Sequence, residues 1–158
     1  SKVGGKIMAV FIPHIPDAIM EDIERLYVTA DSMFGEMTQA GAKVVYSNVM
    51  SNLPASFRTS NIRHHIEITK VYYTKSDGAI NTKVGIYGYF KNKRNRRVPA
   101  PLVANIFEYG KSNFLKQPFF RQSFNKEQIY KAMIEQQSLF LKRNRIKVSE
   151  ALMSAYYL

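Results

Sequence analysis

Apolar residues recur at helical spacing over the first third of the chain. This periodicity predicts a helix of roughly twenty residues. Asp17, Glu21 and Asp22 favour its start, because acidic side chains are stabilising near a helix N-terminus. Helical spacing continues beyond Gly41, so we expect either two helices or one kinked helix over residues 17–52. The apolar positions of the first part are Ile19, Met20, Ile23, Leu26, Tyr27, Ala30, Met33, Phe34 and Met37.

A β-hairpin is predicted after this helical region. Residues 56–65 indicate a short helix or turn, and residues 66–74 are rich in β-branched and aromatic side chains. The Asp77-Gly78 pair is typical of a tight primed turn, which would lead into a return strand over residues 79–90. Alternation along that strand should pack one face against the helices. We expect Ile80, Thr82, Val84, Ile86, Gly88 and Phe90 on the inner face, and Asn81, Lys83, Tyr87 and Tyr89 on the outer face.

Two more helices are predicted in the second half of the chain. Pro101 suits the first turn of a short helix, and Gly110 tolerates the positive φ at which many helices end. Pro118 then opens a second, aromatic element. Asn125, with Gln128 three residues later, is close to a capping box at the start of a C-terminal helix. We expect the side chains of Phe107, Phe119 and Phe120 to join the short helix, the hairpin and the C-terminal helix, with Phe124 close to them.

Together these patterns predict an α+β fold. It has a long N-terminal helix, an antiparallel sheet based on a β-hairpin, and a short helix and a C-terminal helix packed on one face. At 158 residues the chain is expected to form one domain, over residues 17–147. An extended arm, residues 1–16, should precede it, and an apolar tail, residues 148–158, should follow and either fold back on its own domain or dock on a neighbouring subunit. No apolar run reaches the length of a membrane span or a signal-peptide core, so we expect the protein to stay in the cytoplasm where it is made.

Charge is unevenly distributed along the chain. The formal net charge is +11, but residues 1–37 hold 3 bases and 6 acids, whereas residues 38–158 hold 20 bases and 6 acids. Such polarity fits a nucleic-acid face, an acidic protein partner, or the basic side of one subunit meeting the acidic side of the next. The densest positive run should be an exposed loop, which either keeps the protein soluble or contacts phosphate or an acidic protein surface. Its cations are Lys91, Lys93, Arg94, Arg96 and Arg97.

The sequence contains little material for catalysis. It has no cysteine and three histidines, and it lacks a glycine-rich phosphate loop, a nucleophile elbow and a zinc-protease motif. We therefore expect no cofactor, no metal and no enzymatic activity, with a phosphate-handling enzyme as the least supported class. Glu108 stands out as a candidate for a charged contact, with Arg63, Arg121 or a residue of another subunit as its partner.

Two short motifs follow one another in this region. A small apolar helix ends in an E-Y-G turn, and after a variable loop comes P-F-F-R, ahead of the last helix. This order resembles the tail-component family of long-tailed bacteriophages, the tail completion proteins of the head-to-tail neck. The similarity runs from about residue 40 to 137, and Ser60 stands where that family has a glycine. The matching residues are Ala104, Phe107, Glu108, Tyr109, Gly110, Pro118, Phe119, Phe120 and Arg121.

The resemblance implies a structural virion protein of a tailed phage or prophage. Its copies would form a ring, hexameric in the family, between the head connector and the tail tube or tail terminator proteins, with genomic DNA passing through the channel. An alternative from the residues alone is a nucleic-acid-binding module without sequence preference, using the basic run at 91–97.

Overall fold

The computed structural model describes residues 17–58 and 61–147, and the predictions for the arm (1–16) and the tail (148–158) lie outside these residues. The structure is α+β, as predicted. It contains helices α1 (Asp17–Asn52), α2 (Ala55–Arg58), α3 (Ala100–Tyr109) and α4 (Lys126–Arg143), with 3₁₀ turns η2 (Asn61–His65) and η3 (Arg121–Ser123). The strands are β1 (Ile66–Ile68), β2 (Tyr72–Tyr73), β3 (Ile80–Asn81), β4 (Val84–Ile86), β5 (Tyr89–Lys91) and β6 (Arg97–Pro99).

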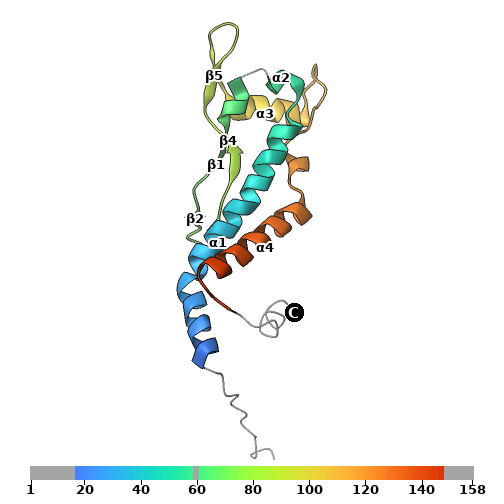
Figure 1. Ribbon diagram of the computed structural model, residues 1–158. Helices are drawn as coiled ribbons and strands as arrows, with labels where there is room; N and C mark the ends of the chain where they lie inside the picture. The colour runs from blue at the N-terminus through green and yellow to red at the C-terminus, as the bar shows by residue number, and fades with distance from the viewer. Residues whose placement is uncertain (1–16, 59–60, 148–158) are drawn as a thin grey trace, which may run out of the picture.

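Helix α1 is the longest element and packs along α4 (Figure 1). The sequence left open two helices or one kinked helix, and the structure has one helix that continues through Gly41. A Cβ at this position would lie 3.1 Å from Cγ2 of Ile129 and 3.3 Å from Cγ of Met133, both on α4. The glycine therefore allows the two helices to approach closely. The N-terminal turns of α1 extend beyond the end of α4 (Figure 1).

The first β-hairpin is present but is shorter and less regular than predicted. β1 pairs with β4, Ile66 opposite Ile86, and β2 pairs with β3, Tyr73 opposite Ile80. The register shifts by one residue between these pairs, which marks a β-bulge. Four residues, 75–78, form the turn, and in the Asp77-Gly78 pair the positive φ belongs to Gly78 alone. The prediction of a tight primed turn is wrong, because type I′ and type II′ turns both need positive φ at their first central residue, which would be Asp77.

A second hairpin, formed by β5 and β6, replaces the end of the predicted return strand. The chain leaves the first hairpin after Ile86, and Gly88 turns it at φ +88°. The strand expected to run to Phe90 is therefore interrupted, because this φ is incompatible with a continuous strand. In the new hairpin Tyr89 lies opposite Pro99, and Lys91 lies opposite Arg97. This hairpin projects from the end of the molecule that carries α3 (Figure 1).

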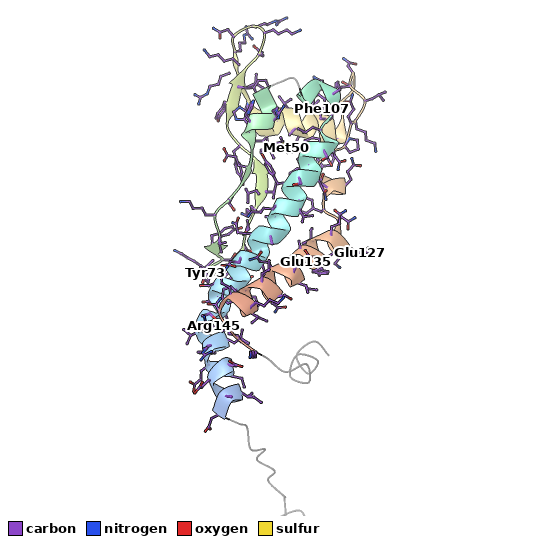
Figure 2. The ribbon with its side chains drawn as sticks, viewed as in Figure 1. Met50, Tyr73, Phe107, Glu127, Glu135 and Arg145 are labelled. Atoms are coloured by element: carbon purple, nitrogen blue, oxygen red, sulfur yellow. The ribbon has the colours of Figure 1, made fainter. Side chains whose placement is uncertain are left out.

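The hydrophobic core lies where α1, β1 and α3 meet the segment before η3. Phe119 is its largest buried side chain, with 1% of its surface exposed. Phe107 and Phe120 are partly buried against this core, as predicted, and Figure 2 shows Phe107 and Met50 at the same end of the molecule. The buried cluster consists of Val45, Val49, Leu53, Ile66, Ala100, Ala104 and Phe119. Among the described residues, no helix is both long and apolar enough to cross a membrane.

Candidate functional site

The carboxylate of Glu108 joins α3 to the aromatic segment that precedes α4. Its Oε2 accepts hydrogen bonds from the backbone N–H of Phe119 and of Phe120, both at 2.9 Å. Its Oε1 accepts a third from the N–H of Arg121 at 3.1 Å. The side chain is buried, with 7% of the residue exposed. One carboxylate therefore binds three successive amides at the start of η3.

This environment explains the charge state of Glu108. Burial raises the pKa of its carboxyl group, but the three amide hydrogen bonds and the nearby charge of Arg121 outweigh that effect, and the pKa is lowered overall. The carboxylate stays ionised at neutral pH and serves as an acceptor. We had expected a partner such as Arg63 or Arg121 in an ion pair; instead, the partners are backbone amides, and the guanidinium of Arg121 lies over the ring of Tyr109 at 5.3 Å.

Gly110 reverses the chain so that the aromatic segment can reach Glu108. It ends α3 with φ +76° and ψ −178°, a backbone region open essentially to glycine alone. A Cβ here would lie 2.9 Å from the carbonyl oxygen of Phe114 and 3.0 Å from the amide nitrogen of Lys116. The returning chain is fixed by a hydrogen bond from the N–H of Gln117 to the carbonyl of Phe107. The predicted positive φ is confirmed.

A shallow surface pocket of about 360 Å³ lies beside this turn. Its two charged side chains are already engaged, since both oxygens of Glu108 bind amides and the guanidinium of Arg121 stacks on Tyr109. Within residues 17–58 and 61–147, no group of three or more His, Asp or Glu side chains is placed to hold a metal ion. The pocket thus offers a polar rim without an acid–base pair. Its lining residues are Ile86, Pro101, Ala104, Asn105, Glu108, Tyr109, Phe119, Phe120, Arg121 and Phe124.

The basic run is the turn of the β5–β6 hairpin, and not the plain loop that we expected. The side chain of Asn92 orders the turn, because its Oδ1 accepts from the N–H of Arg94 and of Arg96, each at 2.9 Å. Asn95 adopts a left-handed φ of 56°, which asparagine tolerates well. All five cations are exposed, as predicted. Figure 2 shows side chains spreading outward from the tip of this hairpin.

The outward face of the hairpin combines positive charge with an aromatic ring. Cross-strand pairing puts Tyr89, Lys91 and Arg97 on this face, while Phe90 and Val98 lie on the opposite, partly buried face. The guanidinium carbon of Arg97 lies 4.2 Å from the centroid of the exposed Tyr89 ring. Sequence reasoning missed this contact. The signal that could have revealed it is the alternation of polar and apolar residues on both sides of the asparagine-containing turn.

The charge polarity of the sequence is partly neutralised within the fold. Glu36 of α1 binds Arg143 of α4, with Oε1 2.6 Å from Nη2, and also accepts from the amide of Gln136. The bond from Arg143 lowers the pKa of the Glu36 carboxyl group. The remaining acidic side chains of α1 lie mainly on its N-terminal turns, at the opposite end of the molecule from the basic hairpin (Figure 1).

Comparisons with known protein families, with curated proteins and with solved structures found no match to this chain.

Proposed function

We propose that this chain is a structural virion protein of a tailed phage or prophage, a tail completion subunit that joins the head connector to the tail tube in a ring at the neck. The observation that carries the proposal is the contact between Glu108 and the amides of residues 119–121. Both motifs behind the resemblance to tail completion proteins take part in that contact.

The contact gives those motifs a physical reason. The E-Y-G motif supplies the carboxylate and the glycine that reverses the chain, and P-F-F-R supplies the amides and the buried Phe119. The loop between them can vary, because the bond depends on the two ends. Two motifs that only hold segments of the chain together are typical of residues that stabilise a fold. Neither oxygen of Glu108 is free to act as a general base. This supports a structural role over a catalytic one.

The distribution of surface features also fits a subunit of an assembly. The molecule is elongated, with an exposed basic hairpin at one end and acidic helical turns at the other (Figure 1). Different surfaces at opposite ends favour contacts between unlike faces of neighbouring copies, which close into rings when the rotation allows.

Association with neck proteins tests the proposal. We expect the purified chain to bind the connector, tail tube or tail terminator protein from the same genome, and not the major capsid protein, which serves as the control. Failure to bind any of these three, with each partner shown to be folded, would contradict the proposal.

A nucleic-acid-binding module is the second candidate, and the Tyr89–Arg97 face favours it. An aromatic ring beside several cations is a common platform for bases and phosphates. In this case the purified chain should bind DNA at moderate salt, with an affinity that falls steeply as salt rises. Weak or absent DNA binding by a chain that does bind neck proteins would exclude this candidate.

A further inference from the structure

The N-terminal half of α1 carries an apolar stripe, and within the described part of the chain four of its six residues are exposed, namely Met20, Ile23, Tyr27 and Phe34. Its residues recur at alternating steps of three and four, which is the spacing of a helical seam. Tyr27 is 86% exposed and Phe34 is 44% exposed, whereas Met33, on another side of the helix, is buried. At its far end the stripe reaches the chain's own first hairpin, near Ile80. We call this stripe the α1 seam; it consists of Met20, Ile23, Tyr27, Ala30, Phe34 and Met37.

The α1 seam is flanked by acidic side chains. Residues 17–36 contain six acids and one base. Several of these acids have partners, such as Glu36 with Arg143 and Asp22 with Arg25. Glu24 borders the seam and makes no ion pair within residues 17–58 and 61–147. Two copies of this helix would place like charges along a shared seam, and like charges repel at such positions. The surface therefore favours a basic partner with some apolar area.

The β5–β6 hairpin has those properties. Residues 89–97 contain five bases and no acid, and the exposed ring of Tyr89 supplies apolar surface. The long aliphatic stems of lysine and arginine can cover apolar side chains while their charged ends reach carboxylates. The hairpin and the α1 seam lie at opposite ends of the molecule (Figure 1). They cannot meet within one chain, but they can meet between copies.

We infer that the β5–β6 hairpin of one copy docks on the α1 seam of the next. Tyr89 and the stems of Arg94 and Arg96 would cover Tyr27, while their charges face Glu24 and its neighbours. Such a contact joins unlike surfaces, so it propagates from copy to copy into a ring or an open filament. The inference rests on the proposed ring assembly and specifies its contact.

Charge reversal tests the contact in the purified full-length chain, with sedimentation velocity as the readout. Two variants reverse one side each: Arg94→Glu with Arg96→Glu on the hairpin, and Glu21→Lys with Glu24→Lys on α1. We expect the wild type to self-associate at low salt, each variant to lose at least tenfold in association constant, and a mixture of the two to regain it. Lys131→Glu with Lys142→Glu, at exposed positions on α4, controls for net charge.

Disulfide trapping tests the geometry, because the chain contains no cysteine of its own. A size-tagged chain with Arg94→Cys is mixed under mild oxidation with a chain carrying Tyr27→Cys. We expect a mixed disulfide in this pair and little in a control pair with Ile134→Cys, an exposed position on α4. Trapping with Ile134→Cys at an equal rate, or a dominant Tyr27→Cys homodimer, would overturn the contact.

Three further outcomes would also overturn it: a wild type that stays monomeric at low salt, an unrestored mixture of the two variants, or a basic hairpin that binds DNA while the chain remains monomeric. None of these results decides the proposed function. That proposal fails separately, if the wild-type chain binds none of the connector, tail tube and terminator proteins.

Discussion

At the residue scale, the side chain of Glu108 holds two separate segments together. Replacing it with glutamine removes the charge and turns one acceptor into a donor, so at least one buried amide loses its partner. We expect Glu108→Gln to lower the free energy of unfolding by about 2–4 kcal/mol at pH 7. Urea denaturation measures this change. The control is Glu135→Gln, at an exposed position on α4, which should change stability by less than about 0.5 kcal/mol.

The same residue makes stability depend on pH. The pKa of Glu108 is lower in the folded chain than the value of about 4.3 expected in the unfolded chain. Its stabilising contribution is therefore fully present above pH ~4.3 and is lost as the pH falls through the folded pKa. The wild type should lose stability over this acid range, and Glu108→Gln should lose less. Parallel pH dependences for the two proteins would contradict the assignment.

Gly110 and Gly78 form a matched pair for a second prediction. Both have positive φ, but a Cβ at Gly110 would meet backbone atoms at 2.9 and 3.0 Å, whereas a Cβ at Gly78 would meet nothing within 4 Å. We expect Gly78→Ala to lower the free energy of unfolding by about 1 kcal/mol through backbone strain alone, and Gly110→Ala to lower it by about 2 kcal/mol or more. Chemical denaturation of both variants measures the difference. Equal costs would show that the turn relaxes around the added methyl group.

At the element scale, Phe119 connects α1, β1 and α3 through the common core. Truncation of a buried phenylalanine typically costs about 3–5 kcal/mol, so Phe119→Ala should lower the thermal midpoint strongly. Phe124→Ala is the control, because Phe124 contacts Phe120 but is half exposed. It should cost clearly less. An unchanged midpoint for Phe119→Ala would show that the core lies elsewhere.

The elements themselves were predictable to different degrees. Helical periodicity and capping signals such as Asn125, whose Oδ1 accepts from the N–H of Gln128, located α1, α3 and α4 because these signals are local. The sequence left open whether Gly41 separates two helices, since the role of this glycine depends on α4, which lies almost ninety residues further on. Gly88 was missed as a break because glycine also fits an ordinary strand. Only its positive φ in the fold separates the two hairpins.

The site was predicted in part. Glu108, Gly110 and Phe119 were singled out from the sequence, but the partners of the carboxylate were not, because every segment has backbone amides and sequence does not show which are free. The contact of Arg97 with Tyr89 depends on the strand register, which the basic run at 91–97 concealed in the sequence. The charges in the sequence predicted an exposed basic surface at residues 91–97, but only the structure shows that this surface is a β-hairpin.

At the scale of the whole molecule, the exposed basic hairpin should matter for interaction and not for folding. Replacing Lys93, Arg94, Arg96 and Arg97 by serine should change the free energy of unfolding by less than about 1 kcal/mol, since exposed charges and an exposed cation–π pair contribute little. Denaturation curves measure this. If the hairpin binds DNA, the same variant should also reduce the salt dependence of binding by up to about four phosphate contacts. A variant that fails to fold would show a structural role for these cations.

Electron microscopy of particles made without this chain tests the proposed neck function most directly. Under the proposal the gene belongs to a phage or prophage genome. It is deleted there, and wild-type or quadruple-serine chain is supplied separately. We predict filled or emptied heads and separate tails after deletion, joined virions with the wild-type chain, and a failure of joining or genome retention with the serine variant. Normal numbers of joined, infectious virions from the deletion strain would contradict the neck function. Normal virions from the deletion strain supplied with the serine variant would contradict a role for the β5–β6 hairpin in the neck function.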